Sequence, residues 1–234
     1  MNFVQFLSRS SQILGSLAVI FPQSVLKMIK LPEVLKKKIQ KEILKNSKKG
    51  ENGWRFSKND EDSLLGDFLG NLRTDKRIFH RFDKEYEWEI LYHKMRGRGK
   101  NAYESKVGAD AIITFEIIDK ISNNKTLKSL IFQAKKEGNN SGLKEQKYKM
   151  DFIAHGGNFI FTCSELGYYA QTEIEGKKMN IGKFLANEFI ECNIGIENFE
   201  YDEINRVLKN NGILIEGVEL DELLVKVEIQ KDYS

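Results

Sequence analysis

The chain has 234 residues, of which 41% are hydrophobic and 30% are charged, and its formal net charge is +3. That length suits one packed domain with an appendage, and the composition is typical of a globular protein. Its two cysteines, Cys163 and Cys192, are far apart and its three histidines lack metal-ligand spacing. These observations argue against a disulfide scaffold or a zinc site and favour a reducing cytoplasm.

Charge is unevenly distributed along the chain. Residues 27–50 contain nine lysines against two glutamates, and residues 91–150 contain thirteen basic against six acidic residues. Residues 197–234, in contrast, contain ten acidic against four basic residues. Basic segments on either side of a site favour a polyanion such as nucleic acid. The alternative interpretation is that the lysines form solvated faces without a ligand.

The first 50 residues predict a helical, lysine-rich N-terminal extension. Their longest uncharged run, residues 10–26, is shorter than the roughly 20 apolar residues of a membrane-spanning helix, and no small-x-small cleavage site follows it. We therefore expect an amphipathic helix that packs on the body of the protein or on a partner, with contact to a membrane surface as the alternative. A second helix is predicted over residues 33–46, where apolar residues have helical spacing.

The remainder, residues 51–234, predicts one α/β or α+β domain. The glycines of residues 47–56 indicate a loop, and a helix with a cap at Asn59 or Asp60 follows over residues 59–73. Strands are predicted at residues 87–95, 106–118, 129–136 and 156–164, with a basic glycine loop at 96–105 and a helix at 142–153. Further on we expect strands at residues 167–175, 212–218 and 223–230 and helices at 181–193 and 200–210.

Three polar side chains stand out in the strands predicted at residues 106–118 and 129–136. Period-2 alternation places Asp110 on one face of the first strand, and Gln133 and Lys135 on one face of the second. If the two strands pair through the turn between them, these side chains converge at one end of a sheet. Mg²⁺ needs only one or two protein carboxylates, so Asp110 is the principal candidate ligand, assisted by the side-chain carbonyl of Gln133 and the backbone carbonyl of Ala134.

A second carboxylate is expected from the helix at residues 59–73. Glu61 in its first turn is the best candidate, and Asp62 or Asp67 is the alternative. Lys135 is expected to orient a water molecule and to offset negative charge that develops on a phosphate.

The pattern Gly108-Ala109-Asp110 followed by Gln133-Ala134-Lys135 resembles the PD-(D/E)XK, or restriction-endonuclease-like, nuclease superfamily. The glutamine makes it a D…QxK variant, similar to some restriction and phage-defence nucleases. The resemblance covers a core of about residues 60–163 and implies an αβββαβ fold with a mixed central sheet. It matches Glu61 to the acidic residue of the first helix and Gln146 to a glutamine that some branches carry after the lysine.

The resemblance implies a Mg²⁺- or Mn²⁺-dependent nuclease, first of all a DNA endonuclease, with RNA open as a substrate. Catalytic roles are expected for Asp110, Gln133, Lys135 and Glu61. The predicted nucleic-acid contacts are Arg96, Arg98, Lys100, Lys136, Gln146 and Lys147. Because the chain has no motor or separate recognition domain, it is expected to be the effector subunit of an anti-phage defence or restriction system. An ATPase or helicase subunit is the expected partner, held through the N-terminal helix, and a homodimer is a further possibility.

Each of these residues also has a plain structural interpretation. Asp110 could cap a turn after Gly108, Lys135 could be a solvated strand end, and Glu61 could favour the helix dipole. Glu104 is a rival metal ligand that could instead pair with a basic neighbour. Because a neutral glutamine binds Mg²⁺ less strongly than a carboxylate, the alternative function is a non-catalytic module of the same fold that binds nucleic acid or a protein.

Overall fold

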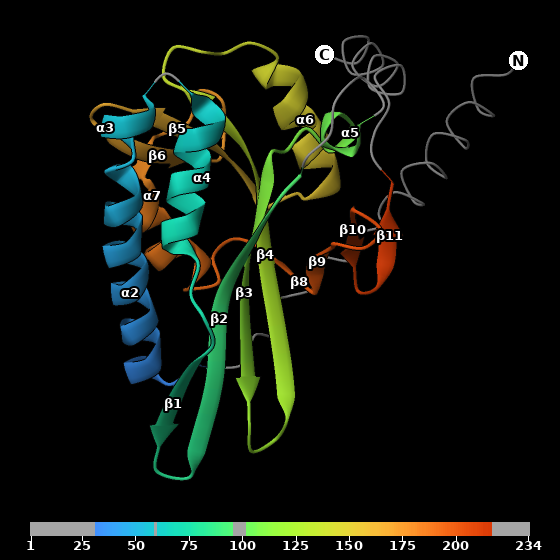
Figure 1. The fold of residues 1–234 in the computed structure, drawn as a ribbon. Coiled ribbons are helices and arrows are strands. Elements are labelled where there is room, and N and C mark those ends of the chain that lie inside the picture. The colour runs from blue at the N-terminus through green and yellow to red at the C-terminus, as the bar shows by residue number, and fades with distance from the viewer. Residues whose placement is uncertain (1–30, 59, 96–101, 217–234) are drawn as a thin grey trace, which may run out of the picture.

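A computed structural model describes residues 31–58, 60–95 and 102–216, and their fold is mixed α+β (Figure 1). Its centre is an eight-stranded mixed sheet of order β1-β2-β3-β4-β5-β6-β7, with β8 paired to β4. Neighbouring strands are antiparallel except for β4 and β5, which are parallel. The strands are β1 (Arg77–Arg81), β2 (Lys84–Lys94), β3 (Ala111–Asp119), β4 (Asn124–Lys136), β5 (Asn158–Ser164), β6 (Gly167–Gln171), β7 (Met179–Asn180) and β8 (Ile196–Glu197).

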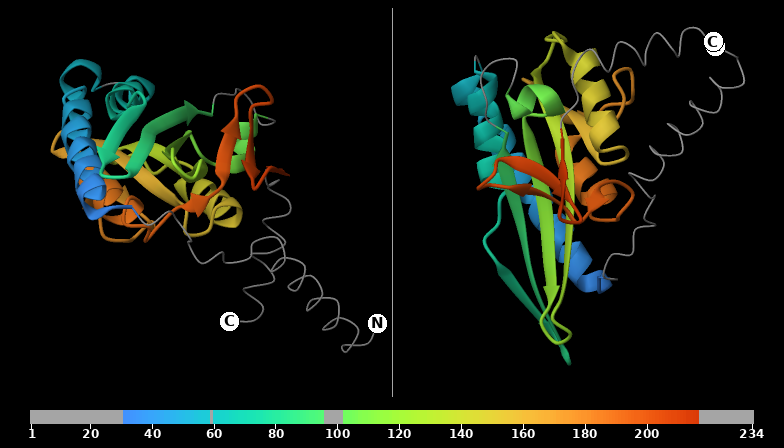
Figure 2. Two further views of the ribbon diagram at one scale, coloured as in Figure 1. Left: turned by 90° about the horizontal axis from the view of Figure 1, so that it is seen from below. Right: turned by 90° about the vertical axis from the view of Figure 1, so that its right-hand side faces the viewer.

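Different elements cover the two faces of this sheet (Figure 2). One face packs against α2 (Glu33–Glu51), α3 (Trp54–Ser57), α4 (Glu61–Leu72), α7 (Ile181–Lys183) and the π-helix η1 (Phe184–Phe189). The other face packs against α5 (Tyr103–Val107), α6 (Leu143–Ile153) and a second sheet of β9 (Phe199–Asp202), β10 (Val207–Asn210) and β11 (Ile213–Ile215). Alternation along β4 explains the division, because Phe132 and Ala134 belong to the first core and Ile131 to the second.

Helix α2 is longer than its sequence predicts. The glycines of residues 47–56 indicate a loop, which is wrong for most of that stretch, because α2 continues to Glu51 and α3 starts at Trp54. Gly50 does not end the helix but lets it approach α4, since a Cβ there would lie 2.9 Å from the Cα of Phe68. A glycine that is required for close packing of two helices therefore gives this stretch a composition that is typical of a loop.

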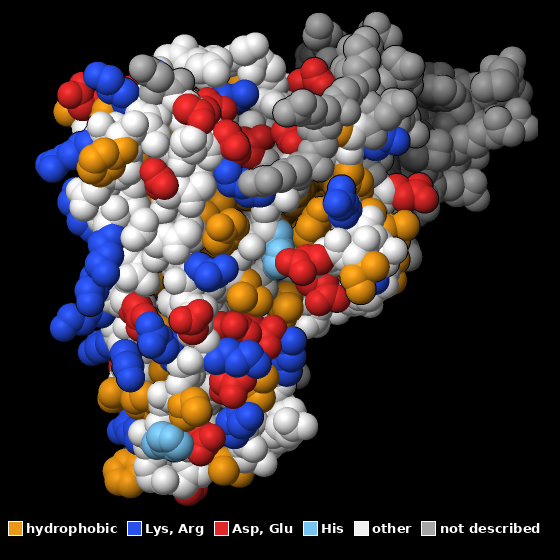
Figure 3. Space-filling model, viewed as in Figure 1, with side chains coloured by type: hydrophobic (Ala, Val, Ile, Leu, Met, Phe, Trp, Pro, Cys, Tyr) orange, Lys and Arg blue, Asp and Glu red, His pale blue; other side chains and the backbone are white. Residues whose placement is uncertain are grey.

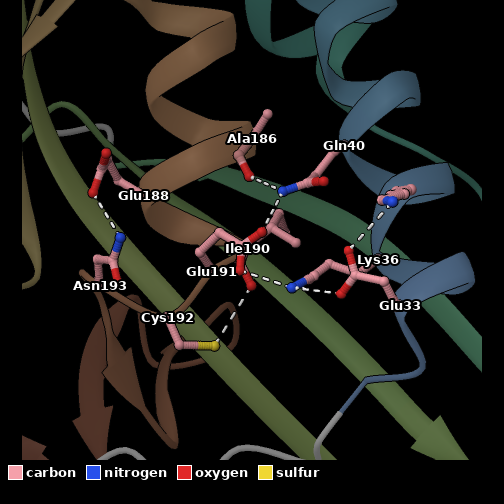
Figure 4. Close-up of polar contacts among 10 residues, drawn as sticks. Glu33, Lys36, Gln40, Ala186, Glu188, Ile190, Glu191, Cys192 and Asn193 are labelled. Atoms are coloured by element: carbon pink, nitrogen blue, oxygen red, sulfur yellow. Dashed lines mark hydrogen bonds and ion pairs between the residues drawn. The ribbon is translucent and has the colours of Figure 1, made fainter.

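The described part of the predicted N-terminal extension, residues 31–50, contributes to the main core. Leu35, Ile39 and Ile43 of α2 are at most 1% exposed and pack in the same cluster as the sheet. Polar contacts fix the same helix to η1 and to the turn that follows it (Figure 4): Gln40 Nε2 donates to the Ala186 carbonyl at 3.0 Å, and Lys36 Nζ donates to Glu191 Oε2 at 2.9 Å. The lysines on the opposite side of α2 are left facing outward.

Several other predicted elements match the structure. Helix α4 is capped by Asp60, whose carboxylate accepts a hydrogen bond from the N–H of Asp62. The strands predicted at residues 87–95, 129–136 and 156–164 correspond to β2, β4 and β5, and the helix at 142–153 corresponds to α6. No helix of the described residues is long and apolar enough to cross a membrane.

The C-terminal part corrects the prediction of a helix at residues 200–210. That segment forms the hairpin of β9 and β10, because the carboxylate of Asp202 accepts the N–H groups of Ile204 and Asn205 and closes a turn at 3.0 Å. The strand expected at residues 212–218 is present as β11. The helix expected near the N-terminus and the strand expected at residues 223–230 lie outside the described residues.

Candidate metal site at the end of strand β4

Strands β3 and β4 end unevenly, and this creates the site. The first residue of β3, Ala111, pairs with Phe132, so β4 continues for four residues without a partner on that side. Two carboxylates take the place of the missing strand. Asp110 Oδ2 accepts the N–H of Ala134 at 2.7 Å, and Glu61 Oε2 accepts the N–H of Lys136 at 2.7 Å. The two acids therefore lie side by side on alternate residues of one strand edge.

Backbone hydrogen bonds to β4 and to the residue after β2 hold Asp110 in position on both sides. Its backbone N–H donates to the Phe132 carbonyl at 2.9 Å, and its own carbonyl accepts the N–H of Met95 at 2.8 Å. Gly108 ends α5 in the left-handed region at φ 74°, and a Cβ there would lie 2.5 Å from the backbone carbonyl oxygen of Gln146 in α6. Only glycine combines that dihedral angle with so close an approach. The predicted strand start at residue 106 is therefore corrected: Asp110 precedes the strand.

Gln133 reaches the same carboxylate from the face of β4. Its Nε2 donates to Asp110 Oδ2 at 2.5 Å and to the Ala134 carbonyl at 3.2 Å. The pKa of Asp110 is nevertheless raised, first by burial and also by the neighbouring Glu61 carboxylate, and these causes outweigh the hydrogen bonds. The repulsion between two neighbouring carboxylates is relieved either when one of them is protonated or when a cation binds between them.

A hollow of about 260 Å³ opens beside the two carboxylates. Its polar lining consists of Glu61, Asp62, Lys94, Glu104, Asp110 and the backbone of Ala134. Acidic side chains are visible on this part of the surface, over the N-terminal turn of α4 (Figure 3). Lys94 Nζ lies on the opposite side of the pair from β4 and bonds to Asp62 Oδ1 at 2.6 Å.

Lys94 was not identified from the sequence, although a signal exists. It continues the face of β2 on which Trp88, Ile90 and Tyr92 point into the core. A lysine at the end of an apolar face marks the place where the core opens to solvent.

The structure brings together most of the predicted catalytic residues. Glu61, Asp110 and Gln133 meet as described, and the charge of Lys135 acts on Asp110 by partly opposing the rise in its pKa. Lys135 Nζ is itself bonded to the Ser141 carbonyl at 3.0 Å, on the far side of the strand from α4. Of the alternatives to Glu61, Asp62 lines the hollow, whereas Asp67 accepts a hydrogen bond from Ser57 at 3.5 Å and does not line it.

The predicted nucleic-acid contacts behave differently from one another. The prediction that Lys147 contacts nucleic acid is corrected, because this residue is 4% exposed and its ammonium group is bonded to Asp151. It is therefore not part of a basic surface. The side-chain oxygen of Gln146 is buried and accepts no hydrogen bond from the described residues. Lys136 is half-buried and its ammonium group lies 5.7 Å from the centre of the Trp54 ring. The remaining three, Arg96, Arg98 and Lys100, lie outside the described residues.

Tyr103 is a second residue that sequence reasoning missed. Its hydroxyl accepts the N–H of Leu208 at 2.9 Å and donates to the Ile215 carbonyl at 2.8 Å, so α5 is fixed to the small sheet. Burial raises the pKa of Tyr103 to about 12, so the hydroxyl stays protonated and keeps both bonds at neutral pH. Because α5 leads directly to Gly108, this contact supports the position of Asp110.

The donor set suits a hard divalent cation. Mg²⁺ takes oxygen ligands and is commonly held by one or two carboxylates with water in the remaining positions. Asp110 and Glu61 supply two carboxylates, and the Ala134 carbonyl points to the same strand edge as its N–H. Among the described residues no group of three or more His, Cys, Asp or Glu side chains surrounds a common metal position.

Comparisons with protein-family models, with curated proteins and with solved structures give no match to this chain.

Proposed function

We propose that this protein is a metal-dependent nuclease of the PD-(D/E)XK kind, acting first of all as a DNA endonuclease. The observation that carries the proposal is that Asp110 and Glu61 accept the N–H groups of Ala134 and Lys136, which β3 does not pair, while Gln133 is bonded to Asp110. Residues separated by 49 positions in the chain thereby form one oxygen-rich corner. The chain order is α4, β1, β2, α5, β3, β4, α6, β5, and without β1 and α5 it is the αβββαβ order that the sequence resemblance implies, which supports the proposal.

Each residue has a role in that chemistry. Asp110 and Glu61 would hold Mg²⁺ or Mn²⁺, with carbonyl oxygens from Gln133 and Ala134 as further donors. When bound, such a cation polarises a phosphodiester and lowers the pKa of water. Lys135 places a positive charge near Asp110, where it offsets the charge that develops on the phosphate. Lys94, across the hollow, supplies a second cationic group toward the strand that is cut.

A second candidate function rests on the contacts of Gln133 and Lys135. The amide nitrogen of Gln133 occupies one oxygen of Asp110, and the ammonium group of Lys135 is bonded to a backbone carbonyl. Both contacts also suit a non-catalytic module that binds nucleic acid or a protein and has no need of a metal. The two functions differ in whether Asp110 is required for cation binding.

Cleavage assays distinguish them. The full chain is incubated with plasmid DNA, single-stranded DNA and RNA in Mg²⁺, Mn²⁺ or EDTA, beside Asp110→Ala and Lys135→Ala. The matched control is Asp83→Ala, which removes an exposed carboxylate in the β1–β2 turn. We expect metal-dependent cleavage by the wild type and the control and at least about a hundredfold loss in both site variants. Cleavage that survives both site substitutions would contradict the assignment.

The cellular role extends this proposal. A cytoplasmic effector subunit of a defence or restriction system, targeted by an ATPase or helicase partner, fits a chain whose described residues contain no motor motif. The docking helix proposed for such a partner lies outside the described residues. Co-purification from the native cell tests it, because a monodisperse chain with full defence activity and no partner would oppose the idea.

A further inference from the structure

The proposed function leaves an exposed aromatic residue and a row of lysines unexplained. Phe56 of α3 is 86% exposed, and it stands between Arg55 and Lys58, which are also exposed. Neither basic residue has an ion-pair partner in the part of the chain that the structure describes. An exposed aromatic ring between two free cations is a common way to hold an unpaired base with its phosphates.

Three exposed lysines of α2 lie in one row along the helix. Lys41, Lys45 and Lys49 are exposed and follow each other at intervals of four residues, so they lie on one side of the helix about 6 Å apart. None of them forms an ion pair within the described ranges. Lysine and arginine side chains run along the edge of the molecule where α2 lies (Figures 1 and 3).

The acidic residues of α2 do not cancel this row. Each of the three is engaged elsewhere: Glu33 with Lys36, Glu42 with Arg77, and Glu51 with Lys48. The row therefore keeps its positive charge along the outward side of the helix. Its upper end joins α3 directly through the turn at residues 52–53.

A chain of contacts links α3 to the candidate metal site. The Asp60 N–H donates to the Ser57 carbonyl at 2.9 Å, so α3 leads into the first turn of α4, where Glu61 lies. Lys136 connects the same two elements, because its N–H binds Glu61 while its ammonium group lies over the ring of Trp54. Helix α3 is thus attached to the turn that carries Glu61, one of the two carboxylates.

We propose that Lys41, Lys45, Lys49 and the α3 residues Arg55, Phe56 and Lys58 form a track for single-stranded nucleic acid, with one unpaired base stacked on Phe56. This deepens the proposed function and rests on it, since it makes the substrate a strand with unpaired bases next to the scissile phosphate. The occupant follows from charge complementarity and from the aromatic platform. DNA and RNA share the phosphate and base chemistry that such a track recognises.

Binding measured without metal tests this proposal independently of catalysis. The full chain in EDTA is titrated into labelled single-stranded DNA, single-stranded RNA and duplex DNA of about 16 nucleotides, and the anisotropy gives each Kd. Phe56→Ala is compared with Phe82→Ala, a matched control whose ring is 96% exposed beside Arg81 at the tip of the β1–β2 hairpin. Lys45→Ala tests the row.

We expect Phe56→Ala to weaken single-strand binding by about 5- to 150-fold, as the loss of one base stack does, and to change duplex binding far less. Lys45→Ala should lower the salt dependence of single-strand binding by about 0.7 in the logarithmic slope. The single-stranded DNA and RNA arms identify which strand is preferred. Equal affinities for the wild type and Phe56→Ala, or equal losses in Phe56→Ala and Phe82→Ala, would overturn the track.

The outcomes also separate this inference from the proposed function. Metal-dependent cleavage by the wild type together with unchanged binding by Phe56→Ala removes the track and leaves the nuclease. Binding that depends on Phe56 without cleavage in any metal removes the nuclease and retains the track, because the titration contains no metal.

Discussion

Replacing Asp110 by asparagine should make the protein more stable and remove its response to Mg²⁺. Asp110 and Glu61 bind N–H groups two residues apart on β4, a separation of about 7 Å. Two like charges at that distance repel by about 2 kcal/mol at an effective dielectric constant of 20. An amide keeps an oxygen for the N–H of Ala134 and loses only the charge assistance of those hydrogen bonds, about 1 kcal/mol.

The net gain in unfolding free energy is therefore about 1 kcal/mol, which raises Tm by about 2–4 °C for a chain of this size. A divalent cation at ten times its Kd would stabilise the wild type by about 1.4 kcal/mol, or about 3–6 °C, and leave Asp110→Asn unchanged. The order of the two melting temperatures should thus reverse between EDTA and Mg²⁺. If the pair holds a cation as proposed, replacing one of its carboxylates exchanges function for stability.

Thermal denaturation in both buffers measures this reversal, with Asp83→Asn as the control that should change neither value. The pH dependence gives a second check. The pKa of Asp110 is raised in the folded state, so the penalty for its charge is present at neutral pH and disappears as pH falls toward the unfolded value of 3.8. The stability difference between variant and wild type should narrow on acidification. A variant less stable than the wild type in EDTA, or an equal Mg²⁺ response in both, would refute this reasoning.

Three further predictions concern the surrounding framework. Gly108→Ala should lower the free energy of unfolding, measured by chemical denaturation, by at least about 2 kcal/mol, and Gly138→Ala should lower it by about 1 kcal/mol. Both glycines have positive φ, but only at Gly108 would a Cβ lie against backbone atoms. Equal losses in the two variants would contradict this. Tyr103→Phe should cost about 1–3 kcal/mol and speed amide hydrogen exchange in β10, and unchanged exchange would count against the contact between α5 and the small sheet. Burial lowers the pKa of Lys128 in β4 to about 8. The free energy of unfolding of the wild type should therefore rise by on the order of 3 kcal/mol as pH increases from 8 toward 10.5, and Lys128→Met should abolish that rise. A parallel rise in both proteins would show that another group is responsible.

Sequence patterns predicted the parts of this fold that depend on a single strong period. The apolar stripe of α4 and the β-branched runs of β3 and β4 were recognisable because burial on one or both faces dictates their residues. The segment at residues 200–210 was wrong because its apolar residues have helical spacing, while the carboxylate of Asp202 closes a turn that periodicity does not register. The loop predicted at residues 47–56 was wrong for a related reason, because the small size of Gly50 allows the contact between α2 and Phe68 and does not end the helix.

The candidate site was predictable only in its residue types. Alternation suggested that Asp110, Gln133 and Lys135 converge, but the uneven ends of β3 and β4, which leave the N–H groups of Ala134 and Lys136 for the two acids, follow from register. Register depends on partners distant in sequence and is not contained in either strand alone. The role of Lys94 depends on the same geometry, because nothing local to β2 places it across a hollow from Asp110.

The most direct measurement is the anomalous scattering from a crystal of the full chain soaked in Mn²⁺. The proposed site predicts one strong peak within about 2.0–2.6 Å of carboxylate oxygens from both Asp110 and Glu61, and no such peak in Asp110→Asn. A peak elsewhere, or none at these carboxylates at a saturating Mn²⁺ concentration, would contradict the metal site on which the proposed nuclease depends.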